Sequence, residues 1–320
     1  MGNELYTVMY HYTRNLNISR YPQIKGLDTE LFRQQLDFFV ENFNIVTMEQ
    51  VIDAWNSANG ELPERALLLT FDDGYIDNYL TAFPLLKERG IQGSFFIPGK
   101  TFSENVLLDV NKIHFILASA DIASLVADLK LQLDYYRGNG FEYEETDILW
   151  NKYAVANRFD CKEVIFVKRI LQTVLPEKLR HIISSQLFEK YVGIKEEVFS
   201  RELYMNRDQI RLMQQEGMYI GLHGYDHYWM ANLSSEALDN DIDSMLRTMD
   251  EFINRDCWVL NYPYGSYNKE VIMAIEPKGC KLGMTTEVGI GKVGVNSRFT
   301  IPRFDCNDFP PKGDRYKEAK

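Results

Sequence analysis

The chain has 320 residues, enough for one large α/β domain or a domain with a sizeable insertion. Its hydrophobic fraction of 45% and charged fraction of 25% indicate an ordinary globular protein, and its net charge of −11 argues against a nucleic-acid or anionic-membrane surface. No basic start leads into an apolar core, and no apolar run is long enough to span a bilayer, so we expect no signal peptide and a cytoplasmic location. The four scattered cysteines form no C-x-x-C pair and fit reduced thiols.

The N-terminal part of the chain predicts a strand followed by two helices. Residues 5–10 are β-rich and lead into His11, so His11 is expected at the carboxyl end of a strand. Asp28 is the expected N-cap of the first helix, and Thr47 with Gln50 makes a capping box for the second.

Two adjacent carboxylates, Asp72 and Asp73, follow the apolar run at residues 67–71. Such a run predicts a strand buried on both faces, and α/β folds place their ligands at the carboxyl ends of such strands. Neighbouring carboxylates repel, so the pair needs a cation or a shared proton. The alternative is that one of them merely caps the helix expected over residues 75–89, which Pro84 would kink.

This alternation of strands and helices predicts a parallel sheet with right-handed crossovers, and it stops at about residue 103. Helical spacing continues to about residue 201, so we interpret residues 103–201 as a mostly helical insertion within a single catalytic domain spanning 1–320. His114 and His181 lie in this insertion without partners at ligand spacing, and we interpret both as ordinary packed or surface histidines.

The alternation resumes after the insertion. His223 and His227 come directly after one expected strand, and Asn261 comes directly after the next. The strands expected in this part of the chain are residues 218–222, 258–260, 280–285 and 298–301.

The spacing of His223 and His227 suits two imidazoles that close on one ion. The helical zinc-protease pattern has a glutamate after the first histidine, and Gly224 stands there, so that mechanism is not favoured. An isolated H-x-x-x-H is more often structural than metal-binding. Combined with a carboxylate at the end of another strand, it forms a triad of two histidines and one carboxylate that suits a catalytic divalent metal.

At this point the sequence resembles the polysaccharide deacetylase family, also called the NodB homology domain or carbohydrate esterase family 4. The family motif T-F-D-D-G stands at residues 70–74, H-x-x-x-H stands at 223–227, and Tyr-Pro-Tyr-Gly at 262–265 approximates a third motif. The resemblance covers residues 66–100 and 206–303. It implies an α/β fold, a distorted (β/α)7-type barrel, and metal-dependent hydrolysis of an N-acyl or O-acyl sugar.

The resemblance also implies roles for individual residues. Asp73, His223 and His227 become ligands of a divalent metal, with Zn²⁺ expected first and Co²⁺, Ni²⁺ or Mn²⁺ as alternatives. Asp72 becomes the general base, and the backbone N–H of Tyr264 becomes a donor to the tetrahedral oxyanion. These roles suit an amide, whose carbon is a poor electrophile until its carbonyl is polarised. For the segment around Tyr264, a plain turn with exposed aromatics is the alternative.

The sequence departs from the family pattern in three places. Asn261 stands where the family usually has an arginine, and Arg303 is either its substitute or a structural ion-pair partner. No histidine follows His227, although the family usually has a late one that protonates the leaving amine. His11 is the best replacement, because its surroundings resemble the first strand of a circularly permuted subgroup, but an ordinary strand-end histidine is the competing interpretation. The helical insertion is the third departure and could shape or cover the substrate cleft.

We therefore predict a metal-dependent deacetylase that acts on a glycan or on an activated or lipid-linked sugar. A deformylase or cyclic-amide hydrolase of the same superfamily is one alternative, and a carbohydrate-binding pseudoenzyme is another. The intact carboxylates and histidines argue against a pseudoenzyme, whereas the missing arginine and late histidine argue for one. No oligomeric state is predicted.

Overall fold

The computed structural model describes residues 2–57, 60–157 and 160–319. The chain forms two compact units. Unit 1 consists of residues 1–15, 26–106 and 201–320, and unit 2 consists of residues 16–25 and 107–200. The helical unit therefore begins and ends within a few residues of the predicted insertion and also includes a short N-terminal segment. That the chain acts as one catalytic domain stays a prediction.

Unit 1 is built on a curled, half-barrel sheet, which confirms the predicted α/β fold class. Its strands are β1 (Glu4–Tyr10), β4 (Asn44–Ile45), β5 (Ala66–Phe71), β6 (Ser94–Ile97), β7 (Tyr219–Leu222), β8 (Trp258–Asn261), β9 (Cys280–Met284), β10 (Gly291–Lys292) and β11 (Phe304–Asp305). The order is β10-β1-β5-β6-β7-β8-β9, with β4 beside β5 and β11 beside β1, and all these pairs are parallel except β10 with β1. A separate pair, β2 (Thr13–Arg14) and β3 (Leu27–Asp28), is also parallel.

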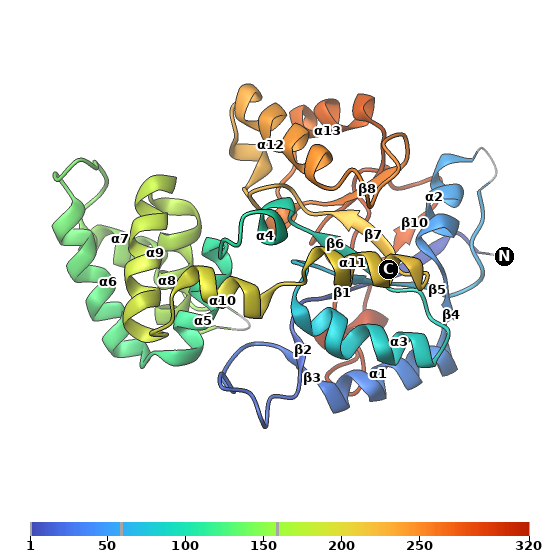
Figure 1. The fold of residues 1–320 in the computed structure, drawn as a ribbon, viewed down its shortest axis with the longest axis horizontal. Helices are drawn as coiled ribbons and strands as arrows, with labels where there is room; N and C mark the ends of the chain where they lie inside the picture. The colour runs from blue at the N-terminus through green and yellow to red at the C-terminus, as the bar shows by residue number, and fades with distance from the viewer. Residues whose placement is uncertain (1, 58–59, 158–159, 320) are drawn as a thin grey trace. The chain divides into compact units, whose positions relative to one another are not determined.

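Helices surround the sheet of unit 1 (Figure 1). They are α1 (Thr29–Asn42), α2 (Met48–Asn56), α3 (Phe83–Glu88), α4 (Gly99–Ser103), α11 (Arg207–Gln215), α12 (Ser235–Thr248) and α13 (Lys269–Ile275). The predicted caps are confirmed: Asp28 accepts the backbone N–H of Glu30, and Thr47 and Gln50 make both hydrogen bonds of a capping box. Large apolar side chains from these helices and from the sheet form its core.

The predicted helix after β5 contains a local irregularity just before Pro84. Residues Asn78–Ala82 form a π-helical turn, and the N–H of Phe83 reaches back to the carbonyl of Asn78. Proline has no N–H to donate, so a change of helical register beside it is expected. The helix then continues as α3 and ends before Gly90, whose φ of 64° suits glycine.

The predicted strand at residues 298–301 is wrong. This segment is a turn: it forms one isolated bridge to β9, at Ile301, and the carbonyl of Arg298 accepts the N–H of Gly283. The short strands β10 and β11 instead flank β1: the chain crosses from β9 to β1 between Met284 and Gly291, returns to β9 at Ile301 and reaches β1 again at Phe304. This crossing brings Arg303 into the interior, where it is fully buried.

Unit 2 is helical. Its helices are α5 (Asp109–Ser119), α6 (Ile122–Tyr136), α7 (Thr146–Tyr153), α8 (Lys162–Arg169), α9 (Glu177–Tyr191) and α10 (Glu196–Leu203), the last of which runs to the boundary with unit 1. The ring of Phe115 packs against Phe199 and against Tyr21 of the N-terminal segment. Across the described part of the chain, no helix combines the length and the apolar character needed to cross a membrane.

The parallel strands of unit 1 all end at the same edge of the sheet. Tyr10 is level with Phe71, and Leu222 is level with Leu260. Side chains that follow β1, β5, β7 and β8 are therefore brought together, although they come from distant parts of the sequence.

Candidate active site

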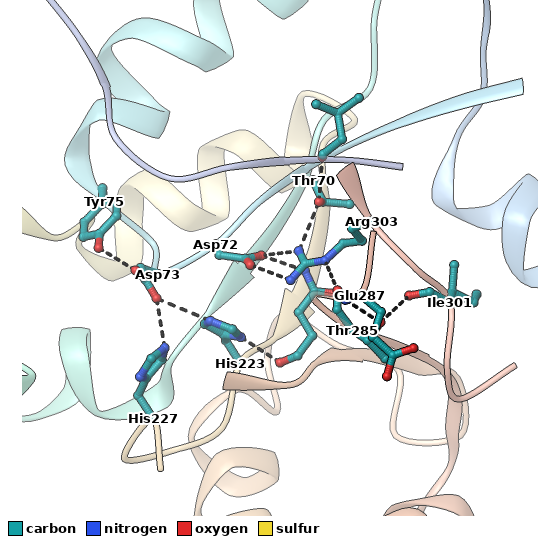
Figure 2. A network of polar contacts seen from close by, with 12 residues as sticks. Thr70, Asp72, Asp73, Tyr75, His223, His227, Thr285, Glu287, Ile301 and Arg303 are labelled. Atoms are coloured by element: carbon teal, nitrogen blue, oxygen red, sulfur yellow. Dashed lines mark hydrogen bonds and ion pairs between the residues drawn. The ribbon is translucent and has the colours of Figure 1, made fainter. Parts of the chain in front are cut away.

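Asp73, His223 and His227 meet at this edge of the sheet (Figure 2). The Nε2 atoms of His223 and His227 lie 3.3 Å and 3.2 Å from Oδ1 of Asp73. One ligand atom from each residue lies within 4.8 Å of the other two, and all three residues are buried. Such a set of one oxygen and two nitrogen donors matches the ligands that a catalytic zinc ion uses.

The polar atoms of this cluster fit a cation. Among the described residues, Oδ1 of Asp73 is buried without a hydrogen-bond partner, although both imidazoles face it. Nδ1–H of His223 donates to the carbonyl oxygen of Asn261 at 2.7 Å, so Nε2, which faces Asp73, is the ring nitrogen left for a metal ion. A buried carboxylate oxygen without a donor is unfavourable in the absence of a cation, and a divalent metal would satisfy it.

The charge states of the three residues are set by burial and by one another. Burial would raise the pKa of Asp73, but the two imidazoles hold it well below its ordinary value, so the carboxylate is ionised. Burial lowers the pKa of His227 and keeps it neutral, as a metal ligand must be. Burial also acts against protonation of His223, but the carboxylates of Asp72 and Asp73 outweigh it and raise the pKa.

The backbone is strained at three of the candidate site residues. Asp73, His227 and Tyr264 have φ angles of 72°, 58° and 58°, and they are three of the five non-glycine residues with positive φ in the described chain. Non-glycine residues avoid this region, and such strain concentrates at functional sites. It is independent support for the choice of these residues.

Asp72 lies beside the cluster and is held by two donors. Nη1 of Arg303 donates to Oδ1 at 3.0 Å, and Nη2 lies 2.8 Å from Oδ2. The side-chain amide of Asn261 also donates to Oδ1, at 2.6 Å. Burial would raise the pKa of Asp72, but Arg303, followed by His223, outweighs it and lowers the pKa.

Comparison with known proteins agrees with this geometry. The sequence profile described as polysaccharide deacetylase matches residues 59–128 and 180–283, which is more than half of the chain. The chain belongs to the polysaccharide deacetylase family. This membership supports sugar deacetylation in general.

Several proteins of this kind resemble the chain. YxkH of Bacillus subtilis (strain 168), whose name assigns it to the same family, is 20% identical over 226 residues, which cover 71% of this chain and 46% of YxkH. The chain thus spans about half the length of this curated relative. Streptococcus pyogenes deacetylase PplD, solved in complex with acetate, has a TM-score of 0.59 at 17% identity over 99% of this chain and 98% of its own. IcaB from Ammonifex degensii has a TM-score of 0.57 at 19% identity over 100% and 99%. At these identities the two structures show a shared fold.

In this chain, two residues contact Asp72, whereas the family pattern predicts a single arginine before the third motif. Asn261, which stands at the arginine's place, reaches Asp72 with its side chain, and Arg303 supplies the charge from a different part of the chain. The guanidinium is fixed further by donating to the carbonyl of Thr285 at 2.8 Å and to the hydroxyl of Thr70 at 3.2 Å. The sequence does not predict Asn261 as a donor to Asp72, because there Asn261 is only the residue that stands where the family has an arginine.

His11 directly follows β1 and is level with Asp72. The N–H of Asp72 donates to the carbonyl of Tyr10 at 2.9 Å, so His11, the residue after Tyr10, lies beside Asp72. Among the charges that lower the pKa of Asp72 and Asp73, His11 is a smaller contributor after Arg303 and the other histidines. The structure therefore brings His11 near both carboxylates, while its role as the acid stays a prediction.

Tyr264 lies in a tight turn at the same edge. Its ring stacks on Trp229 with centroids 4.5 Å apart and planes 5° apart, and it meets the ring of His227 at 4.7 Å. The turn thus places Tyr264 against a proposed metal ligand. The assignment of its N–H as the oxyanion donor stays a prediction.

The other two histidines of the chain lie in unit 2, as predicted. Nδ1 of His181 is 3.1 Å from Asp109, and Nζ of the buried Lys112 lies 3.0 Å from the same carboxylate. His114 belongs to α5 of the same unit. Neither belongs to the cluster of potential metal ligands.

A further site residue missed by sequence reasoning is Asp241 of α12. Its carboxylate accepts the backbone N–H groups of Tyr225 and Asp226 at 3.1 Å and 3.0 Å, so it holds the loop that joins His223 and His227. The sequence does carry a signal for it, because an acidic residue stands on the apolar stripe between Leu238 and Met245. A buried carboxylate on such a stripe needs donors from another segment.

Proposed function

We propose that the chain is a metal-dependent hydrolase that removes an N-acetyl group from a sugar, with Asp73, His223 and His227 holding the metal. The observation that carries the proposal is the unpartnered Oδ1 of Asp73 between two imidazoles, next to a second carboxylate fixed by Arg303. The acetate in the complex of S. pyogenes PplD is the acid that such a reaction releases. The carbohydrate would be a glycan or an activated or lipid-linked sugar.

The proposed chemistry is hydrolysis of an amide by water. A divalent metal in this site would polarise the acyl carbonyl and make water more acidic. Asp72, kept ionised by Arg303, accepts the proton of the attacking water as a new C–O bond forms. The N–H of Tyr264 donates to the oxyanion, and His11 gives a proton to the nitrogen as the C–N bond breaks. The products are a carboxylate and a free amine.

The contact between Arg303 and Asp72 bears on the pseudoenzyme alternative. The missing arginine is one of the two sequence arguments for a pseudoenzyme, and the buried ion pair between Arg303 and Asp72 weakens that argument. The second argument is the missing late histidine, and it holds only if His11 does not act as the general acid in its place. A carbohydrate-binding protein without activity therefore has less support than an enzyme.

The decisive experiment measures free amine released from a panel of N-acetylated and N-formylated sugars. The protein is assayed after chelation and after Zn²⁺ or Co²⁺ is added back, and its metal content is measured by elemental analysis. We expect amine release that depends on added metal, and His223→Ala should abolish both tight metal binding and release. Sugar binding without release would favour the pseudoenzyme, and preference for formyl groups would favour the deformylase.

Metal content provides a separate check on the ligand set. His181→Ala is the matched control, because it removes a histidine of unit 2 that lies outside the proposed site. Unchanged metal content in His223→Ala would show that these three residues are not the site.

A further inference from the structure

The two oxygens of the Asp73 carboxylate have different surroundings. Oδ1 faces the imidazoles of His223 and His227, whereas Oδ2 accepts a hydrogen bond of 2.5 Å from the hydroxyl of Tyr75. Figure 2 shows the phenol on the side of the carboxylate away from the histidines. Hydrogen bonds from a hydroxyl to a carboxylate are short and stronger than those between neutral groups.

The ring of Tyr75 is itself fixed by packing. It is fully buried and stacks on Tyr12 with centroids 4.0 Å apart and planes 18° apart. The ring centroids of Tyr75 and Tyr204 lie 6.2 Å apart, with an angle of 10° between the ring planes. The two residues also form a backbone bridge. Two other segments of unit 1, which carry Tyr12 and Tyr204, therefore hold the position of this hydroxyl.

The backbone fixes the position of Asp73 but does not fix the rotation of its carboxylate plane, which decides whether one oxygen points between the histidines. Asp73 and Gly74 are both left-handed, and the N–H of Met205 donates to the carbonyl of Gly74 at 3.0 Å. The last torsion of an aspartate is broad and has no sharp staggered minima. A contact to the carboxylate itself must therefore set its orientation.

We propose that Tyr75 is a positioning residue for the metal centre: its hydroxyl, held by the stack with Tyr12 and Tyr204, orients Asp73 so that Oδ1 is presented to the metal. This inference rests on the proposed metal site of Asp73, His223 and His227. Partners that hold a metal ligand in this way usually matter for affinity, and their removal costs about 10–100-fold.

The test measures Zn²⁺ affinity by competition with a chelating dye, using the full chain. Tyr75→Phe keeps the ring stack and removes only the hydroxyl, so we expect affinity to fall by about 10–100-fold. Tyr10→Phe is the matched control, because it removes another buried tyrosine hydroxyl of unit 1, which donates to Gln35 at 2.8 Å and not to a proposed metal ligand. Its affinity should equal that of the wild type.

A second readout separates positioning from general loss of structure. The visible spectrum of bound Co²⁺ reports ligand geometry, and we expect it to change in Tyr75→Phe at saturating metal but not in Tyr10→Phe. The unfolding midpoints of the metal-free proteins establish that both variants are folded. If Tyr75→Phe does not fold, Tyr204→Leu replaces it: this change keeps the Tyr75 hydroxyl but removes one of the rings that hold it, so we expect the affinity to fall.

The outcomes distinguish this inference from the proposed function. A wild-type protein that binds no divalent metal would overturn the metal site itself. A wild type that binds metal, together with a folded Tyr75→Phe of equal affinity and an unchanged Co²⁺ spectrum, would overturn only the role of Tyr75. Wild-type affinity in Tyr204→Leu, when that variant is the one used, would also overturn it.

Discussion

Asp72 is the side chain on which proton transfer depends in the proposed reaction. It is buried, ionised and held by Arg303 and Asn261, and it is not one of the three residues that could hold a metal ion. Asp72→Asn keeps the size of the side chain and removes its basicity. We expect metal content to stay unchanged and turnover to fall by about 10²–10⁴-fold. Equal turnover in amine-release assays of wild type and variant would remove Asp72 from the mechanism.

The ion pair between Arg303 and Asp72 is also a stability element. Both groups are buried, and removing one partner of such a pair costs about 3–5 kcal/mol, since the other charge is left uncompensated. We expect Arg303→Gln and Asp72→Asn each to lower the free energy of unfolding in urea. The double variant should lose less than the sum of the two, with a coupling of about 0.5–3 kcal/mol. Strict additivity would show that the two side chains do not interact in solution.

The role of His11 as the general acid can be tested directly. An amide nitrogen leaves poorly unless it is protonated, and histidine titrates in the range that suits a general acid. We expect His11→Ala to retain metal and to slow amide hydrolysis far more than hydrolysis of an activated ester, whose leaving group needs no proton. Comparing the two substrates in one variant provides the measurement, with His181→Ala as the control. An equal loss on both would mean that His11 only supports the site.

At the scale of elements, α12 holds the loop between the two histidines through Asp241. Burial raises the pKa of this carboxyl to about 6, against 3.8 in the unfolded chain. The folded state therefore binds more protons than the unfolded state between about pH 4 and pH 6, so this group makes the protein less stable as pH rises through that window. One pKa unit corresponds to about 1.4 kcal/mol, so the loss reaches about 3 kcal/mol.

Asp241→Asn cannot titrate and should lack this dependence. We expect the difference in unfolding free energy, wild type minus variant, to decrease by about 2 kcal/mol between pH 4 and pH 7, since part of the full change of about 3 kcal/mol lies below pH 4. Urea unfolding at several pH values provides the data, and using the difference cancels the titration of groups that both proteins share. A difference that is constant with pH would mean that Asp241 titrates normally.

Most of these elements could be predicted from local sequence. The strand before Asp72 and the helix caps Asp28 and Thr47 depend only on residues near them in the sequence, and all three predictions are confirmed. The wrong strand at residues 298–301 has β-favouring residues, but its neighbour in space is decided by where the chain crosses the barrel. Local pattern carries no information about that crossing.

The sequence predicts which residues make up the site better than it predicts the contacts among them. The two histidines and the two carboxylates are visible as motifs, whereas the contact of Arg303 with Asp72 joins residues 231 positions apart. Such a contact depends on the register of the whole sheet. The hydrogen bond from Tyr75 and the left-handed backbone at Asp73 leave no mark in the sequence, because neither requires an unusual residue type.

At the scale of the whole molecule, the two units have separate roles in the proposal. All the proposed metal ligands and both apolar clusters of the sheet belong to unit 1. The chain leaves and re-enters this unit at neighbouring points: Nε of Arg201 donates to Asn105 at 3.4 Å, and Leu27 donates to the carbonyl of Tyr12 at 2.9 Å. Short linkers can therefore close both gaps.

We expect a shortened chain, with residues 107–200 and 16–25 each replaced by a short Gly–Ser linker, to fold and to bind Zn²⁺ with the affinity of the full chain. Dye competition measures that affinity, and circular dichroism should show the loss of helix. Comparing amine release from small and polymeric sugars would then show what unit 2 adds. An insoluble product, or one without metal affinity, would show that unit 1 depends on unit 2.

The left-handed backbone at Asp73, His227 and Tyr264 has a consequence for engineering. Each such residue costs of the order of 1–3 kcal/mol, and glycine tolerates the conformation at no steric cost. A variant library screened for thermal tolerance alone would therefore be drawn toward glycine at these positions. Two of the three residues are proposed metal ligands, so the most thermostable variants selected would include those that no longer bind the metal. Directed evolution of this chain needs a second selection, for retained metal, applied in every round.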